Sequence, residues 1–201
     1  MRLCFPQCHE KDRCPWRCAK SRTAAKTISA QKTEWLYDSA FRFFPIEKDE
    51  ELGYRLSFWD AATNKILALA GRNEIRDYLD VLWLDEQHLS LGALAWAACG
   101  KDAGLTPDFI LEEAQRNSRF SAAEVAQFEL AKPIDLVALK QRWLSALAAG
   151  KALIEALPPE ELGCLYLDRA GIPRTPEVKR PEFRELTRHF GSIKGAWPRL
   201  G

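Results

Sequence analysis

The chain has 201 residues and a formal net charge of +1, and its composition, 47% hydrophobic and 28% charged, is ordinary for a globular protein. Seven Trp and ten Phe exclude disorder along the whole chain. The longest apolar run, residues 89–100, is far shorter than the roughly 20 residues of a membrane span. We therefore expect a folded chain with a sizeable core and no membrane-spanning helix.

The first 33 residues differ in composition from the rest of the chain. They hold eight Lys or Arg, two Asp or Glu and four of the six cysteines, whereas residues 34–201 are net acidic. Three interpretations of this leader stand beside one another. It is an unstructured or non-native leader, which we favour, or a basic arm for nucleic acid, or a zinc site. The zinc ligands would come from Cys4, Cys8, Cys14 and Cys18, with His9 beside them.

The two remaining cysteines, Cys99 and Cys164, lie in apolar runs and are predicted to be buried thiols. They offer no disulfide framework for residues 34–201. This cysteine usage favours a cytoplasmic location.

Two strands are predicted after the leader. The segment 39–46 (SAFRFFPI) is aromatic and alternates in part between apolar and polar residues. A charged loop over 47–52 ends at Gly53, and the segment 54–58 (YRLSF) follows. This order predicts a β-hairpin.

Helical patterns dominate the middle of the chain. Asp60 is predicted to be the N-cap of a helix that runs to about Ala70 and stops at Gly71. Two further helices are predicted over 76–87 and 91–99, the second of them apolar on almost every side. Start signals predict three more helices, at Thr106-Pro107, at Ser121 with Glu124, and at Asp135. The last of these is the longest and runs to Leu157.

The pattern changes after this long helix. A strand is predicted over 163–168, a returning strand over 172–175, and a helix over 181–190. The predicted fold class is therefore α+β, mainly α.

Charged residues gather where the first two predicted helices meet. A lysine, two arginines and two aspartates fall within sixteen residues, namely Lys65, Arg72, Arg76, Asp77 and Asp80. Cations and carboxylates that converge at such a joint can hold a polyphosphate and its metal, or an acceptor hydroxyl. The competing interpretation is a solvated Lys65 and a surface pair between Arg76 and Asp80, which are four residues apart.

The run N-K-I-L-A-L-A-G-R-x3-R-D-x2-D-V that carries these residues resembles the C-terminal signature of the AbiEii/AbiGii-type toxin nucleotidyltransferases. The resemblance extends over about residues 34–170. It implies the second half of a polymerase-β-like nucleotidyltransferase core over 34–88. A helical C-terminal domain with a small β element would then cover 89–201.

The resemblance also implies an activity, the transfer of a nucleotide from an NTP with Mg²⁺ to an acceptor such as a tRNA 3′ end. Lys65 would contact the triphosphate, and Asp80 would belong to the catalytic carboxylates. The resemblance assigns nucleotide binding to Arg72, Arg76 and Asp77 as well. The expected partners are a tRNA and a cognate antitoxin, with neither DNA nor a membrane.

The sequence departs from the family at the metal site. Family members hold their metal ions with a Gly-Ser turn followed by an Asp-x-Asp pair. These 201 residues contain no Asp-x-Asp, and the one Gly-Ser, Gly191-Ser192, stands near the C-terminus. Glu34 and Asp38 are the candidates for a further metal ligand. We therefore expect a truncated member that lacks activity, and the alternative is a non-catalytic helical interaction module or a decayed toxin fragment.

Overall fold

The computed structural model describes residues 40–50, 53–126 and 135–193. The leader, with its zinc and nucleic-acid interpretations, lies outside the described residues, as do Glu34 and Asp38.

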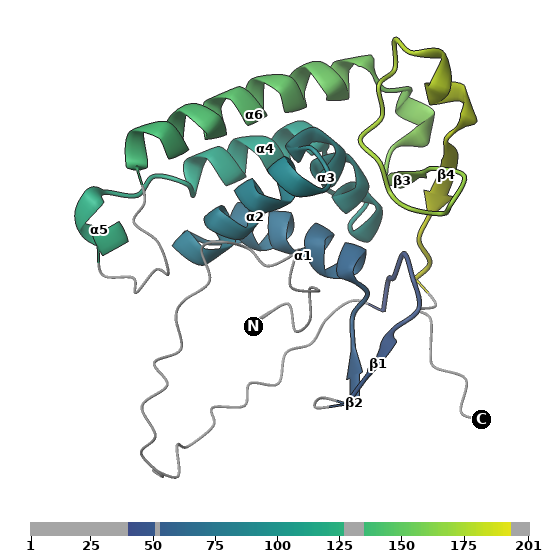
Figure 1. Cartoon of the computed structure of the whole chain (residues 1–201), viewed down its shortest axis with the longest axis horizontal. Helices are drawn as coiled ribbons and strands as arrows, with labels where there is room; N and C mark the ends of the chain where they lie inside the picture. Colours follow the sequence, from purple (N-terminus) through teal and green to yellow (C-terminus); the bar gives the residue numbers. More distant parts are fainter. Residues whose placement is uncertain (1–39, 51–52, 127–134, 194–201) are drawn as a thin grey trace.

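The described chain is a mainly helical α+β fold, as predicted (Figure 1). Its α-helices are α1 (Phe58–Gly71), α2 (Ile75–Gln87), α3 (Leu91–Ala98), α4 (Pro107–Arg116), α5 (Ala122–Ala126) and α6 (Leu136–Ala156). Short 3₁₀ helices cover Cys99–Lys101, Pro159–Glu161 and Pro181–Glu185. Two antiparallel two-stranded sheets pair β1 (Glu47–Asp49) with β2 (Gly53–Arg55), and β3 (Cys164–Leu167) with β4 (Thr187–Phe190). Among these described helices, none is both long and apolar enough to cross a membrane.

Helix α3 forms the centre of the molecule, because all eight of its residues are buried. It packs against α1, α2, α4, α6 and β3, and α6 runs along the outside of the bundle (Figure 1). One hydrophobic core joins residues on both sides of position 88, from Phe41 to Phe183. The division into 34–88 and 89–201 stays a prediction.

Local capping chemistry places most helix starts where the sequence predicts them. Thr106 caps α4 with Pro107 in its first turn, and Asp135 caps α6 by accepting from the amides of Val137 and Ala138. Ser121 and Glu124 form the predicted capping box at α5.

The start of α1 differs from the prediction. Its N-cap is Ser57, whose hydroxyl accepts from the amide of Asp60 at 3.1 Å. Asp60 lies inside the first turn with no exposed surface, and its carboxylate accepts from the amides of Phe43 and Phe44 at 2.9 and 3.0 Å. The prediction that Asp60 is the cap was wrong because its carboxylate binds these two distant amides, while Ser57, whose hydroxyl also donates to that carboxylate at 2.8 Å, takes the capping position.

The same carboxylate explains why the strand predicted over 39–46 is not found in its described part. Two amides that a sheet would use, those of Phe43 and Phe44, donate instead to Asp60. Within 40–46, only Arg42 makes a β-bridge, with Ser192. The hairpin in the structure differs from the predicted one, because β1 falls in the segment predicted to be a charged loop and pairs with β2. The strand predicted over 54–58 is found only at Tyr54 and Arg55, since Ser57 caps α1 and Phe58 begins it.

At the C-terminal end, strand β3 is confirmed, and the helix predicted over 181–190 is found only in its first half. A 3₁₀ helix covers Pro181–Glu185, and β4 follows as the partner of β3. All four residues of β3 are buried, so its backbone groups need partners from another strand. The returning strand predicted over 172–175 contributes only a bridge between Pro173 and Leu167.

The crossing of α3 and α6 depends on two glycines, which gives a stability prediction. A Cβ atom added to Gly92 would meet the backbone oxygen of Gly150 at 2.6 Å. We expect Gly92→Ala to lower the free energy of unfolding by about 1–3 kcal/mol in urea denaturation.

Gly71, at the end of α1, is the matched control, because a Cβ atom there meets nothing within 4 Å. We expect Gly71→Ala to leave stability unchanged or to raise it by up to about 1 kcal/mol. Equal effects of the two substitutions would refute the close approach of α3 and α6.

Candidate functional site

Four of the five charged residues singled out in the sequence meet at the joint between α1 and α2. Lys65 Nζ lies 2.9 Å from Asp77 Oδ1 and 2.7 Å from Asp80 Oδ2. Arg72 Nε lies 2.8 Å from the second oxygen of Asp77. The fifth residue, Arg76, is exposed in the first turn of α2. We call Lys65, Arg72, Asp77 and Asp80 the lysine cluster.

The helix geometry accounts for this meeting. Asp77 and Asp80 are three residues apart on α2, so they share one face of that helix. The chain turns within three residues after Gly71, which lays α2 against α1. Asp77 lies in the first turn of α2, where the helix dipole favours a carboxylate.

The cluster is buried unevenly. The side chains of Lys65 and Asp77 are 5% and 2% exposed, whereas that of Asp80 is 23% exposed and that of Arg72 is 44% exposed. Lys65 is therefore not the solvated side chain of the competing interpretation. Asp80 and Arg72 are the members of the cluster that reach solvent.

Electrostatics keep Lys65 charged in spite of its burial. Desolvation by burial lowers the pKa of Lys65, but the carboxylates of Asp80 and Asp77 together outweigh it and raise the pKa above its ordinary value of 10.5. The formal charges of the four side chains cancel.

The cluster does not fit a magnesium ion. Both oxygens of Asp77 already accept from cations, and Asp80 Oδ2 accepts from Lys65. Magnesium requires close to octahedral coordination by oxygen atoms. Across the described residues, no group of three or more His, Cys, Asp or Glu side chains has the arrangement of a metal site.

Sequence reasoning missed a second buried ion pair, between Asp60 and Lys101. Lys101 Nζ lies 3.2 Å from Asp60 Oδ1, and the two side chains are 7% and 0% exposed. No local pattern indicates this pair, because 41 residues separate its members. Through the amides of Phe43 and Phe44, Asp60 also ties the segment 41–44 to the start of α1.

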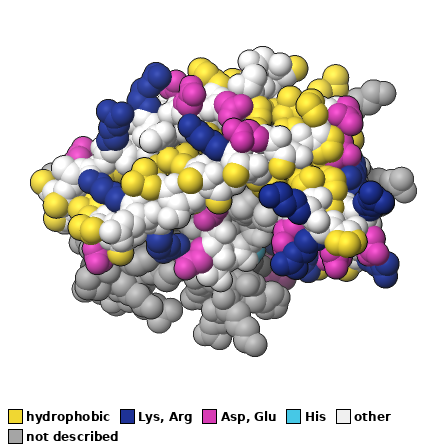
Figure 2. Space-filling model, turned by 90° about the horizontal axis from the view of Figure 1, so that it is seen from above, with side chains coloured by type: hydrophobic (Ala, Val, Ile, Leu, Met, Phe, Trp, Pro, Cys, Tyr) yellow, Lys and Arg dark blue, Asp and Glu magenta, His cyan; other side chains and the backbone are white. Residues whose placement is uncertain are grey.

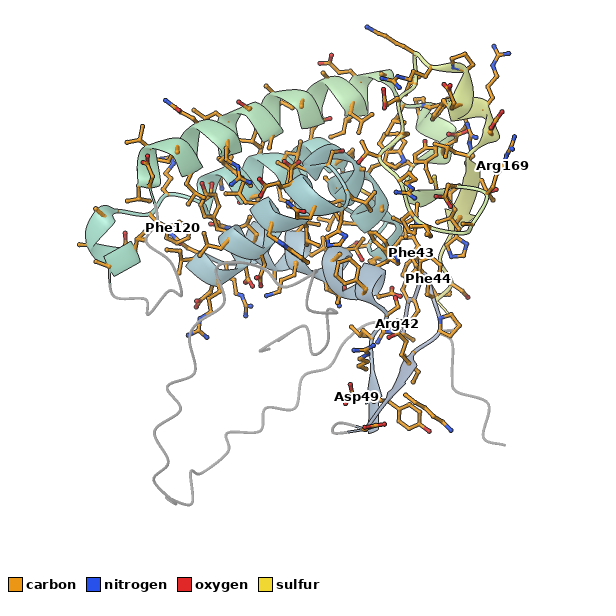
Figure 3. All side chains as sticks on the ribbon, in the orientation of Figure 1. Arg42, Phe43, Phe44, Asp49, Phe120 and Arg169 are labelled. Carbon is orange, nitrogen blue, oxygen red and sulfur yellow. The ribbon has the colours of Figure 1, made fainter. Side chains whose placement is uncertain are left out.

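The C-terminal sheet holds the other side of that segment. His189 of β4 stacks on Phe44 with ring centroids 4.8 Å apart, and its Nε2 lies 2.7 Å from the backbone oxygen of Phe43. Figure 3 shows Arg42, Phe43 and Phe44 between the helices, the β1–β2 hairpin and the C-terminal sheet. These contacts are structural and bring no nucleophile or acid–base pair together.

A cleft of about 320 Å³ opens beside α1 and α4. Its walls are mostly apolar, with Leu67, Leu105, Phe109 and Ile110 among the lining residues. Lys65 does not line it. The cleft and the lysine cluster are therefore separate features of α1.

The surface above α6 shows no separation of charge. In Figure 2 the basic and acidic side chains are interspersed on this face instead of gathered by sign. Several of the described arginines pair with nearby acids, such as Arg142 with Glu86 at 2.8 Å. This face does not resemble the one-sign stripe that nucleic-acid backbones attract.

Comparison of the chain with family models, curated proteins and solved structures found no significant match. The resemblance to the toxin nucleotidyltransferases therefore stays a prediction from the sequence.

The buried ammonium gives a prediction for pH dependence. Lys65→Met removes the cation and leaves the Asp77 and Asp80 carboxylates without it, so at pH 8 we expect a loss of about 3 kcal/mol in the free energy of unfolding. A group whose pKa is raised on folding stabilises fully below its unfolded pKa. The difference between wild type and Lys65→Met should therefore be constant from pH 8 to about pH 10. It should shrink as the pH rises above 10.5 through the raised folded value.

Urea unfolding at each pH measures this difference. Arg116→Met is the control, because Arg116 pairs with Glu113 at 3.0 Å with 69% of its side chain exposed. We expect it to change stability by no more than about 0.5 kcal/mol. A Lys65 effect that disappears below pH 9 would contradict the assignment of a charged, buried lysine.

Proposed function

We propose that the chain is a nucleotidyltransferase-like protein of the AbiEii/AbiGii toxin type, in which the lysine cluster faces the nucleotide. One observation supports this proposal above the others. The lysine and the R-D-x-x-D run that carry the sequence resemblance also meet in space, with Lys65 within 3 Å of oxygens of both Asp77 and Asp80.

The cluster suits a role in orienting an anionic substrate. Asp77 holds Lys65 with one oxygen and Arg72 with the other, so two cations are fixed by one rigid carboxylate. Cations that Asp77 holds in place in this way are already oriented when a triphosphate approaches. Under this proposal Lys65 and Arg72 would contact phosphate oxygens, and Asp77 would be a positioning residue.

The same proposal implies that the chain does not transfer a nucleotide by itself. Nucleotide transfer relies on bound metal ions for charge stabilisation at the reacting phosphate. The sequence has no Asp-x-Asp pair, and the lysine cluster does not fit the ion. The expected substrates are an NTP and a tRNA acceptor, and the metal-binding carboxylates must be supplied by a separate unit.

A non-catalytic helical interaction module is the second candidate, favoured by the balance of charge within the cluster. Each carboxylate already holds a cation. Under this second candidate, the four side chains join α1 to α2 and bind no substrate. In that case Lys65 contributes to stability and has no role in catalysis.

Transfer of label from radioactive NTPs to tRNA separates the two candidates. We expect no labelled tRNA from the chain as it is. Fused behind the Gly-Ser and Asp-x-Asp half of an AbiEii-type toxin, it should label tRNA. Lys65→Ala should abolish the signal in the fusion because it removes a phosphate contact. Asp80→Ala should abolish it because, once displaced from Lys65, Asp80 would be one of the catalytic carboxylates that the resemblance implies. Arg76→Ala, an exposed change in the same helix, should have a milder effect.

The intact toxin is the positive control, and a cooperative melting transition shows that each fusion is folded. Labelling by the unfused chain that is lost with Lys65→Ala would contradict the absence of a metal-binding half. A folded fusion that labels no tRNA, or whose activity survives Lys65→Ala, would favour the interaction module.

A further inference from the structure

The two carboxylates that hold Lys65 are not equivalent, and we propose that Asp80 is an internal competitor for anions at this site. Asp77 is then the permanent partner of Lys65, and Asp80 is the partner that a polyphosphate displaces. This inference rests on the proposed function, because it concerns how the same lysine is regulated.

Asp77 is fixed by its surroundings. It is 2% exposed, and its two oxygens accept from Lys65 at 2.9 Å and from Arg72 at 2.8 Å. An anion that displaced Asp77 would break both ion pairs at once. It would also leave a carboxylate without partners in a place that water barely reaches, which is costly.

Asp80 can leave Lys65 at lower cost. Its side chain is 23% exposed, so a carboxylate that swings away from Lys65 can be hydrated. Asp80 lies three residues beyond Asp77 on α2, on the same face of the helix. Of the two carboxylates that hold Lys65, Asp80 is therefore the one that lies nearer to solvent.

Charge defines the ligand class. With both carboxylates in place the cluster is formally neutral and attracts no anion. An incoming group must outcompete a single carboxylate for a lysine ammonium, which binds phosphate as a point charge. A polyphosphate carries several negative charges and meets this requirement better than sulfate or a single phosphate. Arg72, which is 44% exposed and pairs with Asp77, adds a second cation beside Lys65.

The probe is inorganic tripolyphosphate, titrated calorimetrically at low ionic strength without metal or nucleotide. Asp80→Asn removes the competing charge and should bind tripolyphosphate about tenfold more tightly than wild type. Adding Lys65→Met to Asp80→Asn should abolish this gain. Sulfate should bind every variant more weakly than tripolyphosphate.

Asp168→Asn is the matched control. Asp168 is 24% exposed and pairs with Arg174 at 2.8 Å. Asp168→Asn therefore makes the same change in net charge as Asp80→Asn, at a paired carboxylate of similar exposure. We expect its affinity for tripolyphosphate to equal that of wild type. If Asp80→Asn lacks a cooperative melting transition, Asp80→Ser provides a second neutral side chain at the same position.

Three results would overturn the inference. They are no gain in affinity with a neutral residue at position 80, a gain that persists with Lys65→Met, and an equal gain with Asp168→Asn. Because no transfer is measured, the outcome is independent of the labelling assay. Tighter binding by Asp80→Asn together with an inactive fusion would support the anion site and refute the nucleotidyltransferase proposal.

Discussion

The ammonium of Lys65, held between two carboxylates and almost without water, is the interaction on which the joint of α1 and α2 depends. A buried charge is tolerated only where its partners are placed accurately. The contact therefore helps to set how α2 lies along α1, because Lys65 reaches both carboxylates in one arrangement of the two helices. Buried ion pairs add little net stability, and their contribution here is to fix the geometry of the joint.

Helix α1 carries a second buried charge, Asp60, five residues before Lys65, and the two bind different parts of the chain. Asp60 accepts from the segment 41–44 and from Lys101, whereas Lys65 binds α2. One helix of fourteen residues thus connects the N-terminal part of the described chain, the 3₁₀ helix that follows α3 and the start of α2. His189 continues this network, because it binds the opposite side of Phe43 and Phe44.

The sequence was informative wherever the physics is local. The caps at Thr106, Ser121 and Asp135 could be predicted because each binds amides two or three residues away. The lysine cluster could be predicted because its members lie within sixteen residues on consecutive helices. The burial of Lys65 could not, since a lysine among alanines and leucines fits a solvated helix face equally well.

Long-range contacts account for the errors. The function of Asp60 depends on amides 16 and 17 residues away and on Lys101, and no local pattern encodes those distances. Strand β4 was predicted as helix because the sequence around Pro181 begins like a helix. The buried edge of β3, some twenty residues earlier, pairs with the segment that follows the 3₁₀ helix at Pro181–Glu185 and makes it a strand. In short segments, pairing with a distant strand can outweigh the conformation that the local sequence favours.

Lys65 thus has one permanent partner and one exchangeable partner, and double-mutant cycles on the free energy of unfolding test this difference directly. The cycles combine Lys65→Met with Asp77→Asn and with Asp80→Asn at neutral pH. The account predicts a coupling energy for Lys65 with Asp77 that exceeds the coupling with Asp80 by about 1 kcal/mol or more. Equal couplings, or a stronger coupling with Asp80, would contradict the central claim that Asp77 is the fixed partner.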